Sequence, residues 1–257
     1  FADVGRRTHT LDPDSVRKRI TADTSAIVGV HLWGRPAEVD ALTEIAADYD
    51  IELLFDSAHA FGNTHGGVPI GNFGSAEVFS FHATKFFNSF EGGAIATNDA
   101  NLAERLRSIR NFGFSGYDQV QEIGINAKMT EICAAMGITN LRSLPDVVQA
   151  NRHNHDAYRE AFRGMAGVTL LTYDETERNN FQYAVIEVDQ AYPGSRDSLV
   201  DFLHANGVFA RRYFWPGIHA FDPYREIDPN AEYLLPNTVD TAAGVVALPT
   251  GMSVTPA

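Results

Sequence analysis

The segment that most constrains the fold is residues 51–97, in which two apolar runs are each followed by a reactive side chain. The first run, IELLF, ends at Asp56, and the second, AEVFSF, leads through a short polar turn to Lys85. An earlier apolar run at residues 26–32 precedes the segment PAEVDALTEIAADYD, whose apolar residues recur at helical spacing. A strand, a helix and a second strand in this order predict a parallel crossover unit.

The remainder of the first half of the chain predicts further strands and helices. Strands are expected at residues 26–32, 51–55, 76–81 and 93–97, each bounded by Gly, Asp or Ser. Asn98 is a suitable N-cap for a helix over residues 100–111. Residues 128–144 have a helical periodicity that resumes after Pro145 and runs to Arg163, so we expect two long helices or one helix kinked at the proline.

The character of the sequence changes at residue 168. Strands are expected at residues 168–171, 183–188 and 208–213, with a helix at residues 195–206 between the last two. We therefore predict a large domain at residues 1–145, and a linking helix with a smaller C-terminal α+β domain at residues 146–257. The predicted fold class is α/β, with a mostly parallel sheet in the large domain.

Charge and composition exclude several classes of function. The net charge of −13 disfavours nucleic acid as a partner, and no apolar run reaches the roughly eighteen residues that a membrane span needs. The single cysteine, Cys133, cannot form an internal disulfide and is expected to be a small core residue in a reducing compartment. We therefore predict a cytoplasmic protein without a nucleic-acid or membrane partner, and we assign no metal ligands.

The pairing of Asp56 with Lys85 suggests a particular cofactor chemistry. Pyridoxal phosphate needs a lysine, which binds it as a Schiff base, and an acid, which pairs with its ring nitrogen. Most lysines are solvated surface residues. Phe81, Phe86 and Phe87 would partly desolvate Lys85 and lower its pKa, and the neutral amine is the form that attacks an aldehyde. Asp56 could also simply cap the turn after its strand, so the pair alone leaves both roles open.

The sequence around these two residues is more specific than the pair itself. The sequences FDSAHAFG and SFHATKFFNSFEGGAI, at this separation, resemble the DegT/StrS-type sugar-nucleotide aminotransferases, and the resemblance covers nearly the whole chain. It implies an aspartate-aminotransferase-like large domain, pyridoxal 5'-phosphate as the cofactor, and glutamate as the amino donor to a keto sugar nucleotide. In that setting Lys85 would be the catalytic residue and Asp56 the partner of the ring nitrogen.

The resemblance also implies further contacts. His59 would lie beside the cofactor ring near its phenolic oxygen, and Ser80 would contact the cofactor phosphate. Asn126, in the segment GINAKMTEICAAMG, would reach the phosphate of a neighbouring subunit, which implies a homodimer with shared active sites. For substrate binding we select His82, which alternates with Ser80, and His219 in the loop ARRYFWPGIHAFDPY.

The sequence leaves alternatives for the reaction. The segment HATKFFNSFEGGAI, with His59 and the loop RRYFWPGIH, looks most like relatives that aminate carbon 4 of a thymidine-diphospho-4-keto-6-deoxyhexose. Amination at carbon 3 is the alternative. Sugar-dehydrating relatives replace the lysine by histidine, so Lys85 argues against dehydration. A non-catalytic regulator is disfavoured by the presence of Asp56, Ser80 and Lys85 together. We also expect an excerpt of a longer polypeptide, without the N-terminal part of the large domain and the end of the small one.

Overall fold

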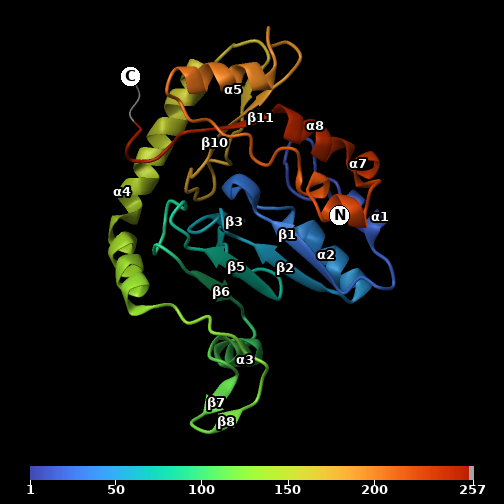
Figure 1. Cartoon of the computed structure of the whole chain (residues 1–257), viewed down its shortest axis with the longest axis vertical. Helices are drawn as coiled ribbons and strands as arrows, with labels where there is room; N and C mark the ends of the chain where they lie inside the picture. The colour runs from blue at the N-terminus through green and yellow to red at the C-terminus, as the bar shows by residue number, and fades with distance from the viewer. Residues whose placement is uncertain (255–257) are drawn as a thin grey trace.

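The computed structural model describes residues 1–254 and contains two principal sheets, one above the other in Figure 1. The larger sheet has the strand order β1-β2-β5-β6. Strands β1 (Ala26–Val30), β2 (Glu52–Asp56) and β5 (Ala76–Ser80) are parallel, and β6 (Gly93–Ala96) runs antiparallel to β5. This mixed, mostly parallel sheet confirms the α/β class and the four strands predicted in this part of the sequence.

Helix α2 (Val39–Tyr49) makes the crossover from β1 to β2 and covers one face of the sheet. Its apolar positions recur at helical spacing and form the core of this unit with Phe55 and Leu53 of β2. The helix ends at Asp50, whose left-handed backbone (φ 51°) stops the helical path. The buried residues of α2 are those expected from the sequence: Val39, Leu42, Ile45 and Ala46.

The smaller sheet is antiparallel, with the order β11-β10-β9. Its strands are β9 (Val168–Leu170), β10 (Ala184–Val188) and β11 (Val245–Leu248). The strand predicted at residues 208–213 was wrong, because only Arg211 forms a bridge, with Ala247. All four residues of β11 are buried, and β11, which the sequence pattern did not predict, pairs with β10.

Helix α4 (Glu131–Ala161) runs along one side of the molecule from the level of the larger sheet to that of the smaller one (Figure 1). It begins after Thr130, whose hydroxyl accepts the N–H of Cys133, and it continues through Pro145 as one helix. Cys133 is half-buried on this helix rather than in the core as expected, because it lies in the first turn, where neighbouring side chains are exposed.

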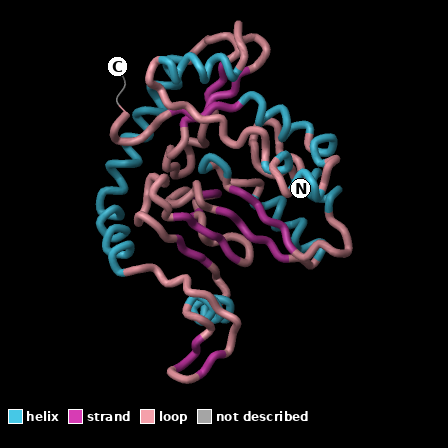
Figure 2. The backbone as a smooth tube through the Cα atoms, viewed as in Figure 1, coloured by secondary structure: helices cyan, strands magenta, loops and turns pink. Residues whose placement is uncertain are grey.

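The other helix predicted in the first half, α3 (Ala100–Arg110), has a different cap from the expected one. Asp99, not Asn98, is the N-cap, and its carboxylate accepts the N–H groups of Asn101 and Leu102. Asn98 lies one residue too early and instead donates to the carbonyl of Asn72. A short hairpin follows α3 and projects from the lower end of the molecule in Figure 2.

Short elements complete the described part of the chain, and loops lie between the two sheets (Figure 2). They are α1 (Pro13–Arg19), β3 (Thr64–His65), β4 (Val68–Pro69), the projecting hairpin β7 (Phe114–Gly116) and β8 (Gln119–Val120), α5 (Arg196–Ala205), α6 (Tyr224–Ile227), α7 (Ala231–Leu234), α8 (Pro236–Gly244), and the 3-10 turns Leu32–Gly34 and Ile218–Ala220. Helix α5 confirms the helix predicted between the strands of the smaller unit. Within residues 1–254, none of the helices has the length and hydrophobicity that a membrane crossing requires.

The first residues of the chain connect the two sheets. The Asp3 carboxylate accepts the N–H groups of Asn237 and Thr238 at the start of α8. His9 Nε2 lies 2.6 Å from Glu187 Oε1 on β10. These contacts hold the first residues of the chain against α8 and β10, directly before α1, whose Val16 packs in the core beneath the larger sheet.

Candidate active site

Asp56 and Ser80 lie at the carboxyl ends of two neighbouring strands. β2 ends at Asp56 and β5 ends at Ser80. Asp56 is in register with Val78, so Ser80, two residues further along β5, faces the same side of the sheet. Asp56 is exposed, and its Oδ1 accepts the N–H of Ala58 over 2.9 Å. Ligands of open α/β sheets bind at these strand ends, so both side chains lie where a ligand is expected.

Lys85 follows β5 in an apolar turn. Phe87 is buried, and Phe81 and Phe86 are half-buried, as is Lys85 itself. Burial lowers the pKa of the Lys85 ammonium, and the charge of Asp56 partly offsets this effect. The structure therefore brings the predicted amine and the predicted carboxylate close enough to influence each other, with the amine less basic than in water.

His59 is buried beside these groups and is surrounded by aromatic side chains. Its Nδ1 accepts the backbone N–H of Trp33 over 3.3 Å, and its Nε2 lies 3.1 Å from the Tyr183 hydroxyl. The Trp33 and Phe214 rings stack with its imidazole, at centroid distances of 6.3 and 6.5 Å. Burial, with a smaller contribution from the charge of Lys85, lowers the pKa of His59 to about 3. His59 is therefore neutral at physiological pH.

Three contacts of His59 were not predicted from the sequence. Trp33 lies 26 residues before it and Tyr183 lies 124 residues after it. The only signal for the third contact was the aromatic content of the loop RRYFWPGIH, which reaches His59 through Phe214. His219 of the same loop is buried in a 3-10 turn and is not among the hydrogen-bond or stacking contacts of His59 within residues 1–254.

Two other selected residues contact different groups. His82 is exposed, with Nδ1 2.8 Å from the Thr84 hydroxyl and Nε2 3.5 Å from the Glu91 carboxylate. Asn126 is exposed after the projecting hairpin, and its Oδ1 accepts a hydrogen bond from Lys128 Nζ over 2.7 Å. The structure thus gathers Asp56, His59, Ser80 and Lys85, while the side chain of Asn126 is hydrogen-bonded to Lys128.

A buried carboxylate that sequence reasoning also missed lies beneath the strand ends. Glu77 is fully buried on β5, and its Oε1 accepts the N–H groups of Gly71 (2.7 Å) and Phe73 (2.8 Å). Its Oε2 accepts the Ser57 hydroxyl over 2.5 Å and lies 3.4 Å from His31 Nε2. Burial opposes the charged form of Glu77, but its hydrogen bonds outweigh burial and lower its pKa.

Replacing Glu77 by glutamine should lower the free energy of unfolding at neutral pH by about 1–3 kcal/mol, because an amide cannot accept hydrogen bonds on both sides. The lowered pKa of Glu77 stabilises the fold above the ordinary carboxyl value of 4.5, and this contribution is lost as the pH falls through the folded-state value. Urea unfolding at about pH 7 and about pH 4 measures both effects. The variant should therefore differ most from the wild type at the higher pH.

The matched control is Glu104→Gln on the exposed face of α3, which should unfold at nearly the wild-type urea concentration. An unchanged urea midpoint for Glu77→Gln at neutral pH would show that the buried carboxylate does not stabilise the fold.

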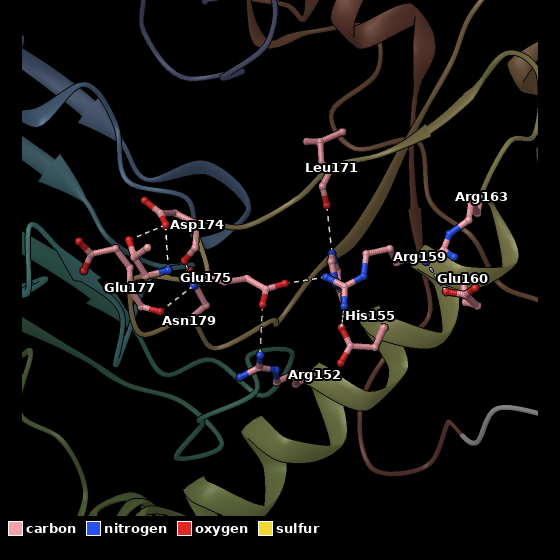
Figure 3. Close-up of polar contacts among 12 residues, drawn as sticks. Arg152, His155, Arg159, Glu160, Arg163, Leu171, Asp174, Glu175, Glu177 and Asn179 are labelled. Atoms are coloured by element: carbon pink, nitrogen blue, oxygen red, sulfur yellow. Dashed lines mark hydrogen bonds and ion pairs between the residues drawn. The ribbon is translucent and has the colours of Figure 1, made fainter.

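A cavity of about 720 Å³ begins beside the lysine turn at Phe86 and extends to the second half of α4. Its far wall is held by polar contacts between α4 and residues 171–179 (Figure 3). Arg159 pairs with Glu175 over 2.6 Å, and His155 Nε2 donates to the Leu171 carbonyl over 3.0 Å. Asn180, which follows this segment, donates to the carbonyl of His59 over 2.9 Å. The loop that lines the cavity therefore also holds the backbone of the candidate site.

The family model of the DegT/DnrJ/EryC1/StrS aminotransferase family matches residues 1–257. The chain belongs to this family. The family and the fold class predicted from residues 51–97 are therefore confirmed. In this DegT-family chain Asp56 ends β2 of the mixed, mostly parallel sheet, and Lys85 lies in the turn after β5.

Several DegT-family proteins are similar over almost all of this chain. The dTDP-4-amino-4,6-dideoxy-D-glucose transaminase of Shigella dysenteriae is 33% identical over 249 residues, which are 97% of this chain and 67% of the relative. The crystal structure of DesI in the presence of its TDP-sugar product is 48% identical with a TM-score of 0.93, and the match covers 100% of this chain and 65% of DesI. This chain therefore spans about two thirds of the length of these relatives.

A more distant structure shares the fold. The Escherichia coli GDP-4-keto-6-deoxy-D-mannose-3-dehydratase with bound hydrated PLP is 22% identical, with a TM-score of 0.81 over 98% of this chain and 69% of the dehydratase. At this level of identity the similarity shows a common fold, and the reaction must be argued from the residues of the site.

Proposed function

We propose that the protein is a pyridoxal-phosphate-dependent aminotransferase that transfers an amino group from glutamate to carbon 4 of a nucleoside-diphospho-4-keto-6-deoxyhexose. The observation that carries this proposal is the approach of Lys85 to Asp56 at the strand ends of a DegT-family chain. The name of the Shigella dysenteriae relative favours carbon 4, and the TDP-sugar product in the DesI structure favours a sugar-nucleotide substrate.

The side chains at the strand ends fit pyridoxal phosphate. Lys85 offers an amine of lowered basicity, and Asp56 offers an exposed carboxylate beside it. Ser80 places a half-buried hydroxyl on the same side of the sheet as Asp56. A cofactor with an aldehyde, a basic ring nitrogen and a phosphate would meet one suitable partner for each group here.

The cofactor, when bound, would supply an electron sink for the electrons left after a C–H bond of the donor is broken. Lys85 would anchor the cofactor and then move the proton, because its lowered pKa leaves more neutral amine at physiological pH. Asp56 would hold a proton at the ring nitrogen, since a carboxylate favours a nearby positive charge. Ser80 would donate its hydroxyl proton to a phosphate oxygen, and the neutral imidazole of His59 would lie beside the cofactor ring.

The test is to supply the holoenzyme with glutamate and either the 4-keto or the 3-keto form of a thymidine-diphospho-6-deoxyhexose, and to identify the amino sugar by NMR. We expect an amino group at carbon 4 and consumption of glutamate. Amination at carbon 3 alone would show that the assignment of carbon 4 is wrong, and the aminotransferase assignment would still hold. Binding of cofactor without turnover of either sugar would favour a regulator, and loss of the sugar oxygen without amination would favour a dehydratase.

We also propose that the working unit is a homodimer with shared active sites. Asn126 is exposed and accepts a hydrogen bond from Lys128, so its side chain is accessible to a partner's cofactor. The nearby start of α4 exposes the large apolar side chains of Ile132, Ile138 and Leu141, which a partner would cover. Light scattering should give the mass of a dimer. A monomer with full activity would rule out the shared site.

A further inference from the structure

Trp33 has a backbone conformation that its side chain disfavours. It is 2% exposed and lies just beyond β1 with φ +63°, in the left-handed region that bulky residues rarely adopt. Such backbone strain is retained only where the surroundings hold it, and it tends to occur at functional sites.

Contacts from two segments hold this conformation. The Trp33 indole N–H donates to His9 Nδ1 over 3.3 Å, and His9 Nε2 lies 2.6 Å from Glu187 Oε1. The Trp33 carbonyl accepts the hydroxyl of the buried Tyr173 over 2.9 Å. Both the side chain and the carbonyl of Trp33 are therefore fixed by buried groups that lie far from it in the sequence.

The third polar group of Trp33 determines the tautomer of His59. A backbone N–H can only donate, so His59 Nδ1, 3.3 Å from the Trp33 nitrogen, must accept. The imidazole is neutral, because burial lowers its pKa to about 3, and its one proton therefore lies on Nε2. The Tyr183 hydroxyl oxygen, 3.1 Å from Nε2, accepts this proton.

We propose that Trp33 is a positioning residue whose left-handed backbone holds His59 in the Nε2–H tautomer, so that the ring beside Lys85 is fixed and uncharged, with its one N–H directed at the Tyr183 hydroxyl. The inference depends on the proposed function in one respect only, namely that the cofactor and substrate are the groups that His59 faces in the working enzyme. A neutral His59 adds no second positive charge next to the lysine, which an imidazolium would do. The other groups facing the ring are Tyr183 and the stacked Phe214.

The tautomer can be measured directly by NMR of the 15N-histidine-labelled protein, with and without cofactor. Nitrogen shifts and their couplings to the ring protons distinguish the two neutral tautomers from imidazolium, and the signal lost in His59→Gln identifies His59. We expect the Nε2–H form with no titration between about pH 5 and about pH 8. A proton on Nδ1, or protonation with a midpoint near the ordinary histidine pKa, would overturn the proposal.

A pair of substitutions tests the role of the backbone. Trp33→Asn and Trp33→Thr remove the indole and leave side chains of similar size, but asparagine tolerates the left-handed conformation and the β-branched threonine does not. We expect Trp33→Asn to keep the Nε2–H tautomer and the wild-type absorbance of the bound cofactor. Trp33→Thr should give mixed tautomers, a shifted absorbance and a kcat at least about 10-fold below that of Trp33→Asn, at similar KM.

Equal tautomers and equal kcat in the two variants would show that only the lost ring matters and would overturn the positioning role. Melting temperatures establish whether both variants fold. If either variant does not fold, the position of the His59 proton in the NMR spectrum of the wild type tests the proposal. A wild-type Nε2–H signal without any covalent lysine–cofactor bond would support the tautomer assignment while contradicting the proposed function.

Discussion

Replacing Lys85 by alanine should lower turnover by about 10⁴-fold, the upper end of what a positioned base contributes. Lys85 is the half-buried lysine whose pKa is lowered next to Asp56, and alanine removes both the anchor of the cofactor and the group that moves the proton. Glutamate consumption and release of 2-oxoglutarate in steady state measure the loss. Cofactor can remain bound non-covalently through its other contacts, so its retention is compatible with the expected result.

Lys85→Arg separates the positive charge of Lys85 from its ability to react as a neutral amine. Arginine keeps a positive charge beside Asp56 but has a pKa above about 12, so it offers no neutral amine. We expect it to be as inactive as Lys85→Ala. Lys18→Ala, on the exposed surface of α1, is the control and should keep wild-type turnover. Activity of Lys85→Arg near that of this control would show that only the charge of Lys85 is needed.

Asp56→Asn should leave cofactor bound but reduce kcat by about 10²- to 10³-fold, the usual loss when a preorganised electrostatic partner is removed. An amide carries no charge and cannot keep a proton on the ring nitrogen. It can still accept the N–H of Ala58, now 2.9 Å from Asp56 Oδ1, so the turn should fold as before. Stopped-flow measurement of the half-reaction with glutamate isolates the affected step.

Asp14→Asn, in the exposed first turn of α1, is the matched control for this substitution and should leave the half-reaction unchanged. A near-wild-type rate in Asp56→Asn would show that Asp56 only caps the turn after β2, which is the structural role that its hydrogen bond to Ala58 also permits.

The larger sheet could be predicted because each of its elements is indicated by the pattern of its own residues. The apolar runs that form β1, β2 and β5 are short and bounded by turn residues, and α2 repeats its buried positions at helical spacing. The smaller sheet depends on pairing between distant segments. Residues 208–213 have a strand-like pattern, but only Arg211 of this segment forms a bridge, with Ala247 of β11. The neighbour of β10 is instead β11, about 60 residues further along the chain, and the local pattern does not show which segment pairs with β10.

The same distinction applies to the site. Asp56 and Lys85 were identifiable because they follow adjacent strands, whose ends must lie close together in a parallel arrangement. The environment of His59 could not be identified from the sequence, because Trp33, Tyr183 and Phe214 reach it from distant segments. Glu77 was missed for another reason: within an apolar run a carboxylate gives no sign that four hydrogen-bonding groups surround it. The domain boundary at residue 145 stays a prediction, as do the roles of all the selected site residues: Asp56, His59, Ser80, His82, Lys85, Asn126 and His219.

The most direct measurement of the central claim is to reduce the holoenzyme with labelled borohydride and to map the label by peptide mass spectrometry. Reduction makes a lysine–cofactor bond permanent, and the chain offers Lys18, Lys85 and Lys128. Lys85 is the lysine whose pKa is lowered by burial, whereas Lys128 is exposed and bonded to Asn126. We expect loss of the visible absorption band, and label only on the peptide that contains Lys85. Label on Lys128, or a stable holoenzyme with no labelled lysine, would contradict it.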